Sequence, residues 1–308
     1  ASAGGGVGFE SFSKKEKNVF MSLFGGSASE SDEDEEVAEK QQSREGEEDK
    51  TEATTEQKTE SIYSSLYTSV CGLPEKVDVV LIERKQRGIA HQLWPAAKFL
   101  CEYFHRNPSE LLNSAQVVDK NKQVLSILEL GAGVGLCGMF VAQLLHQTHS
   151  INALITDLPE AMDGLNENIH RNNLEYTVKA RVLSWGVQNE LDAVMDEFQG
   201  KIPLVVAADC VYWECLYEPL FITVRALITR GCKIIISHVR RWKKDGKFFA
   251  MCRKAGFSVT TLVEDVVMVP AEHTGVPTRQ VTRIYCIAAA GYTPSFAISA
   301  PSASDGFT

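Results

Sequence analysis

The chain has 308 residues, 44% of them hydrophobic, and a formal net charge of −9. Such a chain can bury a sizeable core as one large domain or two small ones. The charge is uneven, because residues 30–60 hold 14 acidic and 4 basic side chains while residues 61–308 hold 24 of each. A neutral body argues against a broad basic surface and so disfavours a nucleic-acid partner, while a local basic patch stays an open alternative.

Composition divides the chain into three regions. Residues 1–60 are rich in charge and poor in apolar side chains, which predicts a disordered acidic tail, either purely solvating or a partner-binding arm. Residues 61–290 carry the periodicity of a folded domain, and residues 291–308 read as a flexible C-terminal tail.

Eight scattered cysteines without a C-x-x-C pair are typical of reduced thiols and predict a cytoplasmic protein, with the nucleus as a second location. Cys210 and Cys215 have no His partner nearby, so we expect no metal site. The sequence has no run of 18 apolar residues, which predicts no membrane span. Because the sequence does not begin with Met, a preceding targeting segment stays an open alternative.

Strand-like and helix-like segments alternate through the body of the chain, which predicts an α/β fold. The predicted strands are 76–84, 124–130, 151–156, 176–183, 202–208, 232–239, 257–264 and 281–289. The predicted helices are 90–104, 135–147, 159–171, 189–198, 214–230 and 242–255. The first strand and helix form an N-terminal extension. The other seven strands predict a Rossmann-like, mostly parallel sheet with helices on both faces. A loop-like connection before the last strand predicts an antiparallel hairpin at one edge.

The segment LELGAGVGLCGM contains two overlapping glycine motifs. From Gly133 it reads G-x-G-x-x-G, the dinucleotide-binding fingerprint, and from Glu129 it reads E-x-G-x-G-x-G. The second register fits local propensities better, because the strand then ends at Leu130 and Gly135 opens the next helix. The G-x-G-x-x-G match would then be an accident of Gly138 lying one helical turn beyond the loop. A plain tight turn stays open.

Open α/β sheets bind ligands at the carboxyl ends of their strands, so residues there are candidate site residues. Asp157 could bind the hydroxyls of an adenosine ribose or cap the following helix. Trp185 could cover an adenine or pack at the sheet edge. Asp209 and Tyr212 could orient an amine, or serve as a helix cap and a core residue.

The stretch HVRRWKKDGKFF adds a cluster of basic side chains, either a solvated helix start or a docking surface for an acidic substrate or the chain's own tail. Its basic residues are Arg240, Arg241, Lys243, Lys244 and Lys247.

From about residue 77 to 289 the chain resembles the seven-β-strand methyltransferases that use S-adenosylmethionine (SAM). Within them it is most similar to the family 16, methyltransferase-like group of protein lysine methyltransferases. The resemblance rests on the spaced set GIAHQLWPAAKFL, LELGAGVGLCG, ITDLPEAMDGLNENIHRNN, LSWG, AADCVYWE and TRIYCIA. The D-x-x-Y that follows the fourth core strand is the most group-specific element.

This resemblance implies a SAM site at the strand ends. It implies that Trp94 walls the cofactor pocket, Glu129 holds the amino-acid end of SAM, Asp157 binds the ribose and Trp185 flanks the adenine. The residues implied to bind the cofactor are Trp94, Glu129, Gly131, Ala132, Gly133, Asp157, Leu158, Trp185 and Ala208.

The resemblance also implies that Asp209 and Tyr212 are catalytic and lie beside the methyl donor and the target amine. We therefore expect methyl transfer from SAM to a lysine of a protein substrate, by a monomer. Three alternatives stay open: a small-molecule methyltransferase, a nucleic-acid amine methyltransferase, and a non-catalytic SAM-binding scaffold. The pair Cys210-Val211 stands where nucleobase methyltransferases often carry two prolines, which weakens the nucleic-acid alternative.

Overall fold

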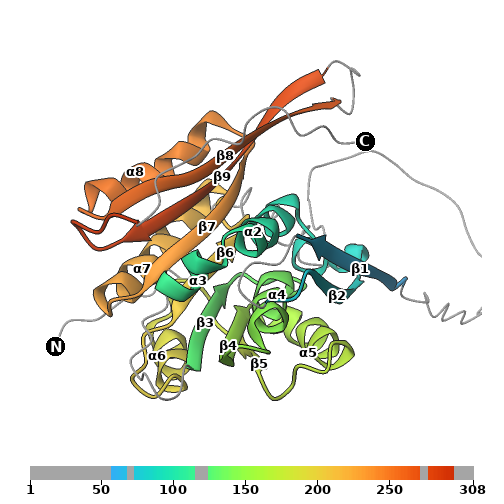
Figure 1. Cartoon of the computed structure of the whole chain (residues 1–308). Helices are drawn as coiled ribbons and strands as arrows, with labels where there is room; N and C mark the ends of the chain where they lie inside the picture. The colour runs from blue at the N-terminus through green and yellow to red at the C-terminus, as the bar shows by residue number, and fades with distance from the viewer. Residues whose placement is uncertain (1–56, 68–72, 115–123, 271–276, 295–308) are drawn as a thin grey trace, which may run out of the picture.

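The computed structural model describes residues 57–67, 73–114, 124–270 and 277–294 (Figure 1). Most of the predicted acidic tail and of the predicted C-terminal tail lies outside the described residues. The first described strand already begins at Thr59, two residues before the predicted boundary. Within these ranges no helix has both the length and the apolar character needed to cross a bilayer.

A seven-stranded sheet forms the centre of the fold, in the order β5-β4-β3-β6-β7-β9-β8. Strands β3 to β7 run parallel, and β9 runs antiparallel to both β7 and β8. The predicted mostly parallel sheet with an antiparallel last strand is therefore confirmed. The strands are β3 (Val124–Leu130), β4 (Ser150–Asp157), β5 (Val178–Val182), β6 (Leu204–Ala208), β7 (Lys233–Arg240), β8 (Ser258–Pro270) and β9 (Pro277–Ala288).

Helices cover both faces of this sheet, as its apolar strands predict. One face packs on α2 (Pro95–Arg106), α4 (Leu136–Leu145) and α5 (Met162–Arg171), and the other on α6 (Gln188–Asp196), α7 (Tyr217–Thr229) and α8 (Gly246–Lys254) (Figure 1). Each set of helices closes one of two apolar cores. A short helix that the sequence analysis missed, α3 (Pro108–Ser114), follows α2.

Helix α2 begins at Pro95, later than the predicted start at residue 90. Proline fits the first turn of a helix because its nitrogen carries no hydrogen to leave unpaired. The residues before it form two single turns of 3₁₀ helix, η2 (Lys85–Arg87) and η3 (Ile89–His91). Three more such turns occur: η4 (Pro159–Ala161), η5 (Glu214–Leu216) and η6 (Lys243–Asp245).

A two-stranded antiparallel ribbon, β1 (Thr59–Leu66) and β2 (Lys76–Glu83), packs against α2, α4 and α5 outside the main sheet (Figure 1). Two asparagines of the α5 region hold β2 in place. The backbone N–H of Val80 donates to Asn172 Oδ1, and that of Ile82 to Asn168 Oδ1, both at 2.8 Å. The sequence analysis predicted β2 but not β1.

The hairpin of β8 and β9 is longer than predicted, because its strands keep pairing as far as Pro270 and Pro277. Residues 268–270 and 277–280, predicted to be loop, are therefore in strands. Strand β7 pairs with β9 only up to Val281, so the end of the hairpin extends past β7 (Figure 1).

Candidate functional site

The carboxyl ends of β3, β4 and β6 meet at one edge of the sheet, where the strand order changes direction. Glu129, Asp157 and Asp209 therefore come together at this edge, as predicted from their places after or near the ends of parallel strands. The turn after β3 lies between them and forms the floor of the candidate site.

The turn after β3 has the backbone of the E-x-G-x-G-x-G register. Strand β3 ends at Leu130 and α4 begins at Leu136, as that register predicts. Gly131, Gly133 and Gly135 have φ values of +58°, +57° and +83°. These left-handed conformations are costly for residues with a Cβ, so three glycines in this turn have a direct conformational cause.

Gly138 lies in the first turn of α4, beyond the glycine loop, and has a packing role of its own. A Cβ at this position would lie 2.3 Å from Ile155 Cγ2 and 2.9 Å from Glu129 Oε2. The missing side chain lets the Gly138 N–H donate to Glu129 Oε2 at 2.8 Å. Glu129 is buried, and its desolvation raises its pKa to about 8 despite hydrogen bonds from Gly138 and Cys137.

Asp157 is tied to the glycine turn. Its Oδ2 accepts the Gly133 N–H at 2.7 Å and its Oδ1 accepts the Leu158 N–H at 2.8 Å. The turn η4 has no side-chain cap, which decides against the helix-cap alternative. Desolvation raises the pKa of Asp157 to about 6, and the two backbone N–H donors oppose the rise. Each oxygen keeps further acceptor capacity for the hydroxyls of a ligand.

Trp185 lies against the glycine turn. A Cβ added to Gly131 would lie 2.8 Å from Trp185 Cζ2 and 3.0 Å from Cys210 Sγ. The partly buried indole also packs on the core beneath α6 and α7. Trp185 thus has the edge-packing contact and lies beside the glycine turn, and its covering of an adenine stays a prediction.

The segment before α2 passes over the glycine turn from the other side. The carbonyl oxygen of Ala90 would lie 3.4 Å from a Cβ on Gly133. Glu83 Oε2 accepts the Leu93 N–H at 2.8 Å, and Trp94 Nε1–H donates to the Ile89 carbonyl at 2.9 Å. These bonds hold residues 89–94 close above the turn.

Asp209 directly follows β6 and has a positive φ of +60°, uncommon for a residue with a side chain. Its carboxylate is buried and pairs with the guanidinium of Arg241. Nη1 donates to Oδ1 at 2.7 Å, and Nη2 donates to Oδ2 at 2.5 Å. The turn η5 has no side-chain cap, so Asp209 does not cap the next helix.

Arg241 is a site residue that the sequence analysis missed by placing it in a solvated or docking basic stretch. Its guanidinium carbon lies 5.5 Å from the ring centroid of Trp94, and hydrogen bonding to Asp209 raises its pKa. Arg241 follows the last residue of β7. The predicted strand ends at residue 239, so the strand-end rule that selected Asp209 points to Arg240 and not to Arg241.

Tyr212 lies in the loop between β6 and η5, three residues after Asp209. The residue as a whole is partly buried, and its ring packs edge-to-face on Trp213 with 5.0 Å between centroids. Desolvation, with smaller contributions that include the charges of Asp157 and Asp209, raises the pKa of Tyr212 well above its usual value. Its phenol is therefore a neutral hydrogen-bond donor at physiological pH.

Two other predicted cofactor residues lie in the same region. Ala208 is the last residue of β6 and is partly buried against the core under α2 and α4. Ala132 is buried in the glycine turn, and its N–H donates to the Thr156 carbonyl at 2.9 Å. The structure thus brings all the predicted site residues to one sheet edge; their contacts with a cofactor remain predictions.

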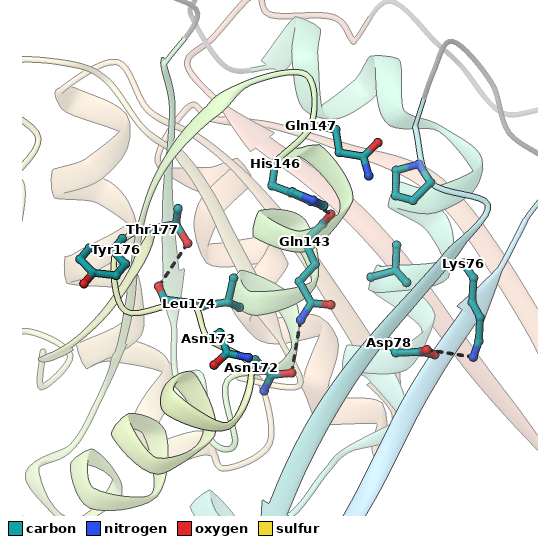
Figure 2. Close-up of a pocket in the computed structure, with 12 residues that line it drawn as sticks. Lys76, Asp78, Gln143, His146, Gln147, Asn172, Asn173, Leu174, Tyr176 and Thr177 are labelled. Atoms are coloured by element: carbon teal, nitrogen blue, oxygen red, sulfur yellow. Dashed lines mark hydrogen bonds and ion pairs between the residues drawn. The ribbon is translucent and has the colours of Figure 1, made fainter.

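A cavity of about 490 Å³ lies elsewhere, at the amino ends of the strands (Figure 2). It is lined in part by Asp78, Gln143, His146, Asn172 and Tyr176. Helix α4 begins at the glycine turn and ends at this cavity, so about 15 Å of helix separates the two. The cavity does not belong to the candidate site.

A family model described as lysine methyltransferase matches residues 74–255. The chain is 32% identical over 171 residues to protein-lysine N-methyltransferase EFM6 of Saccharomyces cerevisiae, covering 53% of this chain and 69% of that protein. It is 31% identical to protein N-lysine methyltransferase METTL21A of Danio rerio, over 57% of this chain and 72% of that protein. It is 35% identical to EEF1A lysine methyltransferase 3 of Mus musculus, over 46% of this chain and 51% of that protein. The chain belongs to the lysine methyltransferase family.

Proposed function

We propose that this protein transfers a methyl group from SAM to the ε-amine of a lysine in another protein. The observation that carries the proposal is the buried carboxylate of Asp209, which lies with Tyr212 across the glycine turn from Asp157. A buried anion of this kind favours a cationic group, and a lysine side chain is one. The names of the relatives, which are protein-lysine methyltransferases, support the same substrate class.

The residues around the turn fit the cofactor. SAM would supply, when bound, a methyl group made electrophilic by its sulfonium. Asp157, with Leu158, would accept the ribose hydroxyls, while Trp185 and Ala208 would flank the adenine. The residues that would hold its amino-acid end are Glu129, Gly131, Ala132 and Gly133, and Trp94 would close the pocket above them.

Asp209 and Tyr212 would position the acceptor amine. A lysine is protonated at pH 7, so its ammonium would first be held by the Asp209 carboxylate. The same burial that raises the pKa of Tyr212 disfavours both charges of the ammonium–carboxylate pair, so the site would promote loss of the ammonium proton to Asp209 or water. The Tyr212 oxygen could then accept one of the remaining amine hydrogens and orient the nitrogen lone pair.

Tritium-labelled SAM incubated with a cell lysate tests this proposal. The wild-type protein should label the protein fraction, Asp209→Ala should abolish labelling while SAM binding persists, and Arg240→Gln, at an exposed neighbouring position, should label normally. Label that accumulates in RNA or in small molecules would point to the corresponding alternative enzyme. Binding of SAM without any transfer would leave a cofactor-binding scaffold.

We further propose that the protein acts as a monomer in the cytoplasm, with the nucleus as a second location. Light scattering after size-exclusion chromatography should give the mass of one chain. A dimer mass would contradict the first statement, and a fluorescent fusion confined to another compartment would contradict the second.

A further inference from the structure

The ion pair between Asp209 and Arg241 is unequal in its access to water. The Asp209 side chain is 3% exposed, whereas the Arg241 side chain is 29% exposed. The carboxylate is fixed at the end of β6, with its backbone N–H bonded to the Ser237 carbonyl at 2.9 Å. Only the guanidinium of this pair has a route to solvent without disturbing the sheet.

The backbone of Arg241 is anchored independently of its side chain. Asp245 is buried, and its Oδ2 accepts the N–H groups of both Arg241 and Trp242 at 2.9 Å. The guanidinium also lies near the face of Trp94, which can stabilise a cation outside the ion pair. The side chain can therefore leave Asp209 while the turn that carries it stays in place.

Asp209 needs a cation whether or not Arg241 is there, because an unpaired buried carboxylate is costly. The nearby imidazole of His238 does not supply this charge, since desolvation lowers its pKa and keeps the ring neutral near pH 7. A group that displaces the guanidinium must therefore bring a positive charge of its own.

We propose that Arg241 is a place-holder cation, occupying on Asp209 the position of the target lysine's ammonium until the substrate displaces it toward Trp94. This inference rests on the proposed function and adds a determinant of specificity to it. A neutral acceptor, such as a hydroxyl or the amine of a nucleobase, would displace the positive charge of Arg241 from Asp209 without replacing it. Arg241 therefore selects for aliphatic ammonium groups.

The test uses n-butylammonium, which has the four-carbon stem and the charge of a lysine side chain, and its neutral isostere 1-butanol. Both are titrated by ligand-observed NMR into the full chain saturated with S-adenosylhomocysteine. Arg241→Gln should bind n-butylammonium about tenfold more tightly than wild type, because the ligand no longer has to displace the guanidinium. A tenfold change in affinity corresponds to about 1.4 kcal/mol. Affinity for 1-butanol should not change. Arg240→Gln, the same substitution at the exposed neighbouring position, should behave as wild type.

A merely structural role for Arg241 predicts the opposite sign, because damage to the site weakens binding. Equal or weaker n-butylammonium binding by Arg241→Gln overturns the proposal, and so does an equal gain for 1-butanol. Arg241→Lys keeps a competing charge and should bind n-butylammonium as weakly as wild type. In case Arg241→Gln does not fold, wild type labelled with ¹⁵N-arginine provides a second measurement. Its Arg241 Nε signal, identified by its loss in Arg241→Lys, should shift with n-butylammonium, and a signal that does not move overturns the proposal.

Asp209→Asn separates this inference from the proposed function. If that variant binds n-butylammonium as well as wild type, Asp209 is not the ammonium site and both proposals fail. If it loses binding while Arg241→Gln gains none, the proposed role of Asp209 stands and the place-holder role of Arg241 fails.

Discussion

The carboxylate of Glu129 lies against the first turn of α4, where its Oε2 accepts a 2.8 Å hydrogen bond from the Gly138 N–H. The Glu129 Oε2 oxygen and the side chain of Ile155 occupy the space that a Cβ on Gly138 would enter. The position of the buried carboxylate thus depends on the absence of a side chain one helical turn beyond the glycine loop.

Gly138→Ala should destabilise the protein by about 1–3 kcal/mol, the usual range for overpacking a core. The clash with buried Ile155 must outweigh the roughly 1 kcal/mol by which alanine favours a helix. Urea denaturation measures the change. Gly246→Ala is the matched control, because Gly246 begins α8 with no atom within 4 Å of an added Cβ. Equal stability of Gly138→Ala and wild type would refute the packing role.

The sequence predicted the edge of the sheet where the site lies, because strand periodicity is local and the carboxyl ends of parallel strands share an edge. Asp157 and Asp209 followed from that rule, and Glu129 from the E-x-G-x-G-x-G register and the family resemblance. The turn followed from its glycines, since Gly131 and Gly133 require a conformation that few other residues adopt.

Contacts between distant segments could not be predicted in the same way. The pairing of Arg241 with Asp209 joins two strand ends 32 residues apart, and a run of basic residues conceals which of them points inward. Strand β1 was missed because only Tyr63 and Ser65 of its eight residues are buried, which leaves little apolar periodicity. The need for glycine at position 138 depends on Ile155, a residue of the neighbouring strand.

Glu129→Gln should change the dependence of stability on pH. The pKa of Glu129 is raised in the folded protein to about 8, so its carboxyl favours folding when protonated. That contribution is complete below the unfolded value and is lost as pH rises through about 8. Relative to Glu129→Gln, the free energy of unfolding of the wild type should fall by up to about 1.4 kcal/mol per pH unit between pH 5 and 8. Denaturation of both proteins across this range measures the difference, and a difference independent of pH would contradict the assignment.

Asp157 should make cofactor affinity depend on pH. Its pKa is raised to about 6, and only the carboxylate form offers both oxygens as acceptors to the ribose hydroxyls. The Kd for S-adenosylhomocysteine should therefore rise below about pH 6, by at most tenfold per pH unit. Calorimetric titration from pH 5 to 8 measures it.

Asp157→Asn provides the control for that titration. The variant should bind the same ligand roughly 10- to 100-fold more weakly at pH 7.5, as expected for losing hydrogen bonds to a charged group, and its affinity should lack the change near pH 6. A wild-type affinity that stays constant between pH 5 and 7 would remove Asp157 from the ribose site.

Tyr212→Phe should lower kcat about tenfold, the effect of one hydrogen bond of about 1.4 kcal/mol, with cofactor affinity unchanged. On the proposed mechanism the phenol would orient the amine and would not hold the cofactor. Tyr176→Phe is the matched control, because Tyr176 is 97% exposed and lines the cavity at the opposite end of the strands. Rates equal to wild type in both variants would exclude a role for the Tyr212 hydroxyl.

The central claim is that the methyl group is transferred to a lysine nitrogen, and total acid hydrolysis of the labelled protein fraction tests it most directly. Amino-acid analysis should place the tritium in Nε-methylated lysine, and the Asp209→Ala reaction should give none. Label recovered in another amino acid, or released as methanol from an ester, would contradict the account.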